Sequence, residues 1–244
     1  MQHLEDPSDI GDYVISARSF NEYQAMFALA DDDLHGTILD CPGGGSEFTA
    51  LATAAGATAL AADPIYEESI EALAQLVAVE ADRGNAHTVA NSSRYSWEFF
   101  GDPEGHRRVR QASARTFAQD LRAFPERYVS AALPTLPFKD DEFDLVLSSH
   151  FLFTYADRLD STIHREALLE LHRVCRGEVR VFPLIDHAGR PLTALVDQLR
   201  EELADLGIPT QVQRVDYEFQ RGGSHMLVVG QRRKLGRSPV HAER

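Results

Sequence analysis

Cysteine is scarce in this chain of 244 residues, which contains only Cys41 and Cys175. Two cysteines cannot build a disulfide scaffold or a cysteine-rich metal site. Hydrophobic residues make up 43% and charged residues 25% of the sequence, which excludes a disordered chain, a collagen and a coiled coil. The length fits one full domain with additions, or two small domains, and it is sufficient for a sizeable core.

Positive charge is also in short supply. The sequence has 24 Lys and Arg residues against 38 Asp and Glu residues, and its formal net charge is −14. A surface of this sign repels nucleic-acid phosphates and anionic lipid head groups, whereas it suits a cationic ligand. We therefore expect neither a nucleic-acid partner nor a membrane-surface role.

Long apolar runs are missing as well. No stretch approaches the roughly 20 apolar residues of a membrane span. Residues 1–10 contain three acidic residues and no apolar run, unlike a secretion signal. These absences predict a soluble, cytoplasmic protein.

Strand-like and helix-like patterns alternate along the sequence. Apolar runs at 37–41 and 57–62 predict buried strands, and a helical stripe follows each of them. The second helix is predicted over 67–83, with Gly84 and Asn85 as its stop. Further strand patterns lie at 127–132, 143–149 and 178–182, further helical patterns at 163–175 and 192–206, and a hairpin pattern at 212–219 with 226–231. This alternation predicts an α/β fold with a parallel sheet and crossover helices.

The alternation lapses over 86–125, which we predict to be a mostly helical insertion. Its aromatic residues suit a substrate lid with ring faces near a cation, and a homodimer contact accounts for them almost as well. The loop after the strand at 143–149 adds a further aromatic side chain that can wall an acceptor pocket. The predicted substrate-binding residues are Arg94, Tyr95, Trp97, Phe100 and Tyr155.

A glycine-rich turn follows the first predicted strand. Ligands of open parallel sheets lie beyond the carboxyl ends of the strands, and consecutive glycines let a ligand approach the backbone. The turn is Pro42-Gly43-Gly44-Gly45, and Asp63 closes the next strand, where a carboxylate can accept both hydroxyls of a ribose. Together these features predict a nucleoside-containing cofactor.

The details of this turn favour one kind of cofactor. The turn lacks the G-x-G-x-x-G spacing that fits a dinucleotide pyrophosphate. Asp40 places a negative charge at the strand end, which disfavours a diphosphate and favours an ammonium or sulfonium group. S-adenosylmethionine is the better chemical match, and an NAD(P)-dependent oxidoreductase is the less favoured alternative.

Four linked segments resemble motifs of the class I S-adenosylmethionine-dependent methyltransferases. Ile38-Leu-Asp-Cys-Pro-Gly-Gly-Gly45 resembles their first motif, and Ala59-Leu-Ala-Ala-Asp63 resembles their second-strand acidic motif. The segment 136–149 is similar to their connection into strand four, and the final hairpin is similar to their reversed strand. The resemblance covers about 37–231.

This resemblance implies a fold and a domain organisation. The expected fold is a Rossmann-like, seven-stranded, mostly parallel sheet with a C-terminal antiparallel hairpin strand and helices on both faces. The methyltransferase domain is expected at 37–232, with an N-terminal helical cover at 1–36 and a flexible tail at 233–244.

The resemblance also implies which residues bind the cofactor. Asp40, Pro42, Gly43, Gly44 and Gly45 would meet its amino-acid end, Asp63 its ribose, Pro64, Ile65 and Leu133 its adenine, and Ser148 and Ser149 its methionine arm. Tyr13 or Arg18, in the N-terminal cover, would close over its carboxylate. Two positions depart from the family pattern: Pro42 replaces the first motif glycine, and Ala132 replaces the acid that binds the adenine amino group. These departures motivate a second hypothesis, a non-catalytic regulatory or scaffold protein that binds S-adenosylmethionine.

Methyl transfer is an in-line displacement, so the protein mainly aligns the reactants and excludes water. A base is needed only if the acceptor arrives protonated. His150 directly follows a strand and is the first candidate, with His187 and His225 as weaker ones. Their spacing matches no metal signature, so no metal site is predicted. The leading prediction is a methyltransferase (EC 2.1.1 type) acting on a small-molecule acceptor, with the acceptor atom left open.

Overall fold

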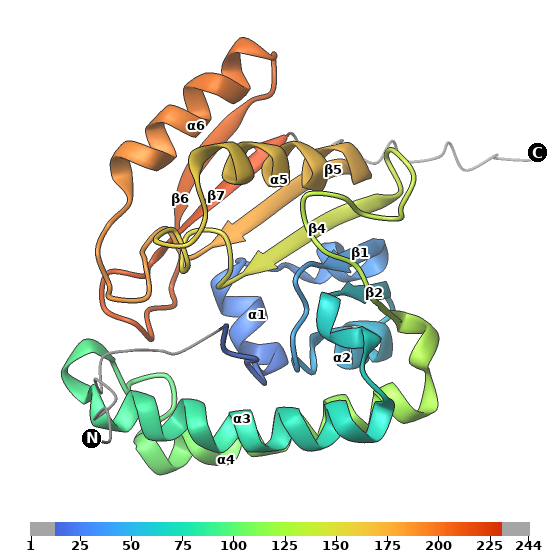
Figure 1. Cartoon of the computed structure of the whole chain (residues 1–244), viewed down its shortest axis with the longest axis vertical. Coiled ribbons are helices and arrows are strands. Elements are labelled where there is room, and N and C mark those ends of the chain that lie inside the picture. The colour runs from blue at the N-terminus through green and yellow to red at the C-terminus, as the bar shows by residue number, and fades with distance from the viewer. Residues whose placement is uncertain (1–12, 231–244) are drawn as a thin grey trace, which may run out of the picture.

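The computed structural model describes residues 13–230, and these form one seven-stranded sheet in the order β3-β2-β1-β4-β5-β7-β6 (Figure 1). The strands are β1 Thr37–Asp40, β2 Thr58–Ala62, β3 Tyr128–Val129, β4 Phe143–Ser149, β5 Cys175–Phe182, β6 Thr210–Arg214 and β7 His225–Gly230. β1 to β5 pair in parallel, whereas β7 is antiparallel to both β5 and β6. The predicted fold class is confirmed. The predicted tail at 233–244 lies outside the described residues.

Helices cover both faces of this sheet (Figure 1). They are α1 Phe20–Met26, α2 Phe48–Ala54, α3 Ile70–Ala90, α4 Pro103–Ala123, α5 Ser161–Val174 and α6 Thr193–Asp205. Short 3₁₀ helices occupy Asp31–His35, Pro64–Glu67, Ser92–Arg94 and Pro125–Arg127. Within residues 13–230, none of the helices combines the length and apolar character that crossing a membrane requires.

Two of the three hydrophobic clusters in residues 13–230 follow from the two-residue period of the strands. Leu39 of β1 and Val146 of β4 are buried with the apolar residues of α5 and α6. Their neighbours Ile38 and Leu147 are buried in a second cluster with α1 and α2. Because alternate residues of the central strands face opposite ways, apolar clusters cover both faces of the sheet around β1 and β4. A ligand site near these two strands is therefore left to the strand ends.

α3 and α4 form a long antiparallel pair beside α2 (Figure 1). The predicted stop of α3 at Gly84 is wrong, because the helix continues to Ala90. Its apolar face keeps packing on α4, and the Asn85 amide oxygen accepts a hydrogen bond from Nδ1 of His106 on α4 at 2.7 Å. The segment predicted as an insertion is therefore the end of α3, a short connection and α4.

Two strands are shorter than predicted. β3 ends at Val129 because its neighbour β2 ends at Ala62, so no partner remains for residues 130–132. β6 ends at Arg214, and residues 215–224 form a long connection instead of a tight hairpin turn. This connection leaves the sheet because Tyr217 and Phe219 pack into the core beside α1.

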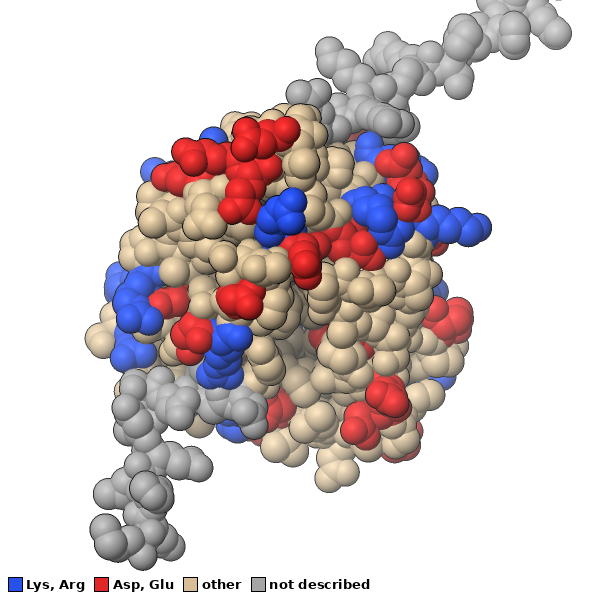
Figure 2. All heavy atoms as spheres, turned by 45° about the horizontal axis from the view of Figure 1, so that its top comes forward, with Lys and Arg blue, Asp and Glu red and all other residues tan. Residues whose placement is uncertain are grey.

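Acidic and basic side chains are mixed on one face of the molecule. On the face shown in Figure 2, Asp and Glu side chains lie in several groups with Lys and Arg side chains between them. The net charge of −14 does not gather in a single patch on this face.

Candidate active site

A cavity of about 430 Å³ lies at the carboxyl ends of β1, β2 and β4. The chain runs outward from β1 in one direction to β2 and in the other to β4, which makes this the point where ligands of open α/β sheets bind. The volume is within the range of small-molecule sites. Its walls come from the turns after β1, β2, β3 and β4 and from the N-terminal segment, which we define as residues 13–18.

The glycine turn after β1 fits tightly against its neighbours. A Cβ atom on Gly43 would lie 2.6 Å from the Tyr66 hydroxyl, and one on Gly45 would lie 2.4 Å from Val77 Cγ1. Gly44 has a φ of +54°, which favours glycine. Pro42, Gly43 and Gly44 line the cavity, whereas Gly45 lies outside its walls. The glycines thus serve the packing of the turn as well as an open approach to its backbone.

Asp63 joins this turn to the end of β2. Its Oδ2 accepts a hydrogen bond from the Gly44 N–H at 2.9 Å, and its Oδ1 accepts one from the Ile65 N–H at 3.1 Å. Burial raises the pKa of Asp63, and the two backbone N–H groups oppose this rise. Each carboxylate oxygen keeps further acceptor capacity, so Asp63 can still accept from the hydroxyls of a bound ribose.

Asp40 does not line the cavity. Both of its carboxylate oxygens accept from the Tyr23 hydroxyl, at 3.0 and 2.9 Å. Tyr23 is part of the cavity wall, and Asp40 lies behind it. Burial raises the pKa of Asp40, and the nearby charge of Asp63 raises it further. A bound cation would lower both pKa values again, so this end of the cavity favours a cationic ligand.

The remaining residues predicted to bind the cofactor divide by position. Pro64, Ile65 and Leu133 line the cavity, as does Ser149 at the end of β4. Ser148 is fully buried and lies outside it. Ala132 lines the cavity, so this position offers no carboxylate to a ligand.

The N-terminal segment covers one side of the cavity. Tyr13 is 49% exposed, and its ring packs against Phe151 and Tyr155 at centroid distances of 5.9 and 4.7 Å. The Tyr155 hydroxyl accepts a hydrogen bond from the Val14 N–H at 2.8 Å, which holds the segment down. Arg18 closes the segment at its other end and lines the cavity.

A smaller cavity of about 100 Å³ adjoins the first. Its other walls are α3, α4, the loops after β4 and β5, and residues 215–224. The two cavities share the wall residues Val14, Ile15, Ser16, Arg18, His150 and Tyr155. The two cavities are therefore adjacent along these residues.

His150 stands at the junction of the two cavities, directly after β4. Its backbone has a φ of +51°, and its N–H donates to the Phe182 carbonyl at 2.7 Å, so this turn is fixed from β5. Nδ1 lies 2.9 Å from the Ser149 hydroxyl. Burial, and next the charge of Arg18, hold the pKa of His150 well below its usual range, so the imidazole is neutral at pH 7.

The other two predicted histidines do not join His150. His187 lines the smaller cavity, with Nδ1 3.5 Å from Asp157 Oδ1. His225 is exposed at the start of β7 and lines neither cavity.

The predicted substrate residues are also divided. Tyr95 lines the smaller cavity and Tyr155 lines both. Arg94, Trp97 and Phe100 line neither of them. The Trp97 and Phe100 rings pack on Phe219 at centroid distances of 5.5 and 5.0 Å, so they support the cavity wall from behind.

Sequence reasoning missed several residues of the smaller cavity, among them His106, Arg110, Thr154 and Phe219. His106 and Arg110 are four residues apart and so share one face of α4, which is a signal the sequence carried. Phe219 stacks on His106 at 4.8 Å, a contact across distant segments that no local pattern indicates.

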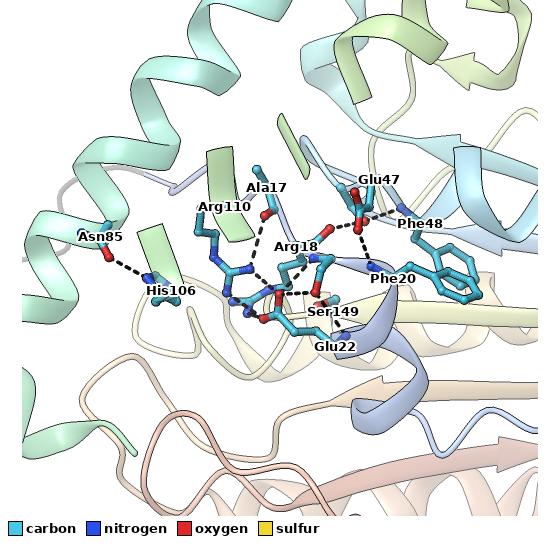
Figure 3. Close-up of polar contacts among 12 residues, drawn as sticks. Ala17, Arg18, Phe20, Glu22, Glu47, Phe48, Asn85, His106, Arg110 and Ser149 are labelled. Atoms are coloured by element: carbon cyan, nitrogen blue, oxygen red, sulfur yellow. Dashed lines mark hydrogen bonds and ion pairs between the residues drawn. The ribbon is translucent and has the colours of Figure 1, made fainter. Parts of the chain in front are cut away.

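A buried ion-pair cluster holds the N-terminal segment to α4. Arg18 and Arg110 both reach the fully buried carboxylate of Glu22 on α1 (Figure 3), with Arg110 Nη2 at 2.7 Å from Oε1. The Tyr217 hydroxyl donates to Oε1 at 2.8 Å. Burial alone would raise the pKa of Glu22, but Arg110 and Arg18 hold it well below its usual range.

Comparison with known proteins agrees with the motifs and the sheet order. The chain is 31% identical over 222 residues to the uncharacterized protein MJ0045 of Methanocaldococcus jannaschii, an alignment that covers 91% of this chain and 97% of that protein. The chain therefore belongs to the same family as MJ0045, and its residues 105–182 match the family model described as a methyltransferase domain.

Solved methyltransferase structures are similar at low sequence identity. One is the 1,6-didemethyltoxoflavin-N1-methyltransferase of Burkholderia thailandensis with bound 1,6-didemethyltoxoflavin and S-adenosylhomocysteine (17% identity, TM-score 0.47, 86% of this chain and 78% of that one). Another is the magnesium protoporphyrin IX methyltransferase of Synechocystis PCC 6803 with bound S-adenosylmethionine (15% identity, TM-score 0.47, 87% and 77%).

The position of Asp63 in the cavity wall gives a first prediction. We expect Asp63→Asn to weaken S-adenosylhomocysteine binding about 10- to 100-fold, because a charged acceptor for the ribose is lost. Isothermal titration calorimetry measures the affinity. Glu68→Gln, an exposed carboxylate on the same loop, is the control and should bind as the wild type does. Wild-type affinity in Asp63→Asn would remove Asp63 from the cofactor site.

Proposed function

We propose that this protein transfers a methyl group from S-adenosylmethionine, bound in the 430 Å³ cavity, to a small-molecule acceptor bound in the 100 Å³ cavity. This proposal rests on the residues that line both cavities. An in-line displacement needs the acceptor atom close to the methyl group and in line with it, and these two cavities are adjacent only along the shared residues. The cofactor supplies a methyl group already activated by its sulfonium leaving group.

The chain's own residues then have three tasks. Gly43, Gly44 and Asp63 bind and orient the cofactor from the strand ends, and Ile65 and Leu133 offer apolar faces for its adenine. The N-terminal segment excludes water from the common wall. His150 takes a proton from an acceptor that arrives protonated, since its neutral ring borders both cavities.

The smaller cavity also bears on the alternative, a protein that binds the cofactor without turnover. Pro42 and Ala132 motivated that alternative, and both residues line the cofactor cavity without closing it. A regulatory protein needs no second cavity next to the reactive end of its cofactor. The second cavity, with a neutral histidine at its entrance, therefore favours the enzyme.

Gly84 allows a test of where the acceptor lies. It lines the smaller cavity from the middle of α3, and a Cβ atom there meets nothing within 4 Å. Gly84→Phe should fill the cavity without strain, since removing a glycine from a helix interior stabilises it by up to about 1 kcal/mol. We expect this variant to bind S-adenosylhomocysteine normally and to lose methyl transfer.

The assay incubates the protein with S-adenosylmethionine and the small-molecule fraction of an extract from its source. Mass spectrometry identifies the methylated product and quantifies S-adenosylhomocysteine release. Gly84→Ala is the matched control, because it changes the helix in the same way and adds only a methyl group. Methyl transfer by Gly84→Phe at the wild-type rate would place the acceptor elsewhere, and binding of the cofactor without any product would favour the regulatory alternative.

A further inference from the structure

The smaller cavity contains more guanidinium than carboxylate groups. Arg18, Arg83 and Arg110 line it. Glu80 lines it too and pairs with Arg83 at 2.7 Å, while Glu22 pairs with the other two arginines. Arg18 and Arg110 share the single carboxylate of Glu22, so within residues 13–230 these two guanidiniums carry one positive charge more than the carboxylate they contact.

Glu22 has no acceptor capacity left for this charge. Its two oxygens accept from Arg110, from Arg18, from the Tyr217 hydroxyl, and from both the N–H and the hydroxyl of Ser19. An ionised carboxylate offers about four lone-pair sites, and these bonds fill them. The Nε–H of Arg18 is buried and has no hydrogen-bond partner among residues 13–230.

Two other residues of this cavity hold unpartnered polar atoms. The Thr154 side chain is buried, with the residue 6% exposed, and its Oγ1 has no hydrogen-bond partner. Nδ1 of His187 also makes no hydrogen bond, and the nearby Asp157 is 40% exposed, so water screens its charge. Together with Arg18 these are three of the five such atoms in residues 13–230. All three can donate, and Arg18 Nε can only donate.

The buried ring of His106 adds no charge to this cavity. Burial, and next the charge of Arg110, lower its pKa to about 3, so the ring is neutral at pH 7. Its Nδ1 donates to the Asn85 amide oxygen. The excess charge therefore stays on the guanidiniums, where a bound anion would neutralise it.

The size of the cavity limits what can enter. The smaller cavity has a volume of about 100 Å³, and one water-sized group needs about 10–15 Å³ of it. The part of a ligand inside the cavity therefore has on the order of seven to ten non-hydrogen atoms. A small carboxylate satisfies the charge, the donors and the volume at once.

We propose that the acceptor carries a carboxylate, and that Arg18 and Thr154 hold this carboxylate in the smaller cavity. The assignment rests on the proposed function, because it names the acceptor class of that site.

Benzoate and benzamide provide a matched pair of probes, since they have the same shape and differ in charge. Titration calorimetry on the protein saturated with S-adenosylhomocysteine should show benzoate binding about tenfold tighter or more, as expected for hydrogen bonds to a charged group. Arg18→Gln should abolish this preference, and Thr154→Val should weaken benzoate binding severalfold. Arg108→Gln, an exposed arginine on α4, should retain the preference.

Several results would overturn the assignment. These are equal affinities for the two probes, no binding of either, or a preference that survives in Arg18→Gln. A further arm separates the acceptor from the cofactor's own carboxylate by comparing S-adenosylhomocysteine with 5′-methylthioadenosine, which lacks the amino-acid end. If Arg18→Gln weakens only S-adenosylhomocysteine binding, Arg18 serves the cofactor and the proposal fails. The Gly84→Phe assay is read independently, so failure of the proposed function remains distinguishable.

Discussion

His150→Asn is expected to lower the rate of methyl transfer by about 10²- to 10⁴-fold, the usual contribution of a general base. Asparagine is chosen because it tolerates the left-handed backbone at this position, where φ is +51°, and because it cannot take up a proton. The affinity for S-adenosylhomocysteine should change far less, because Asp63 and the glycine turn provide the cofactor contacts. Rates are measured as S-adenosylhomocysteine release with the acceptor identified from the extract.

The pH dependence gives this prediction a second readout. Since burial and Arg18 hold the pKa of His150 below its ordinary value, the ring remains neutral below pH 6.5, and turnover should not fall as the pH decreases through 6.5. His225→Asn, an exposed histidine outside both cavities, serves as the control. A wild-type rate in His150→Asn would show that the acceptor attacks without losing a proton to His150.

Glu22→Gln should lower the free energy of unfolding by about 3–5 kcal/mol, because it leaves two buried guanidiniums without their anion. The side chain of Glu22 is 0% exposed and that of Arg110 is 7% exposed, so water cannot take over the lost interaction. Equilibrium unfolding in urea, followed by circular dichroism, measures the change.

The effect of Glu22 must also depend on pH. Its folded pKa is depressed, so its contribution is fully present above the unfolded value of about 4.3 and is lost as the pH falls through the folded value. The wild type and Glu22→Gln should therefore converge in strong acid. Glu104→Gln breaks an exposed pair with Arg107 and should leave the unfolding midpoint unchanged. A Glu22→Gln midpoint equal to the wild type would contradict the ion-pair argument.

The sheet and the cofactor end of the site were predictable from the sequence because short-range patterns encode them. Apolar runs mark β1 and β4, a glycine turn follows β1, and Asp63 ends β2 at the same edge. Three of the predicted cofactor residues, Asp40, Gly45 and Ser148, fall outside the cavity; the family resemblance implied all three, and the charge of Asp40 at the strand end supported it as well. Asp40 packs inward against Tyr23, Gly45 lies against Val77, and Ser148 is fully buried.

The acceptor end was much less predictable, because distant segments build it. His106 and Arg110 meet Phe219 and Glu22 only when α4 and residues 215–224 fold over α1. The aromatic residues Trp97 and Phe100 were correctly recognised as unusual, yet they pack behind the cavity wall. Local sequence shows which side chains cluster, but not which side of a wall they occupy.

The Gly84 position illustrates how such an error arises. A glycine followed by asparagine usually ends a helix, and local propensity favoured that outcome. Packing of α3 on α4 and the Asn85 to His106 hydrogen bond outweigh it. The glycine that was taken for a stop instead keeps a side chain out of the smaller cavity.

The N-terminal segment has a consequence for the reaction cycle. Val14, Ile15, Ser16 and Arg18 form part of the wall of both cavities, and Arg18 is tied through Glu22 to α4. Any displacement of this segment that releases the spent cofactor also opens the acceptor cavity. The residence times of the two ligands are therefore coupled through the N-terminal segment. The order of product release depends on how this segment moves.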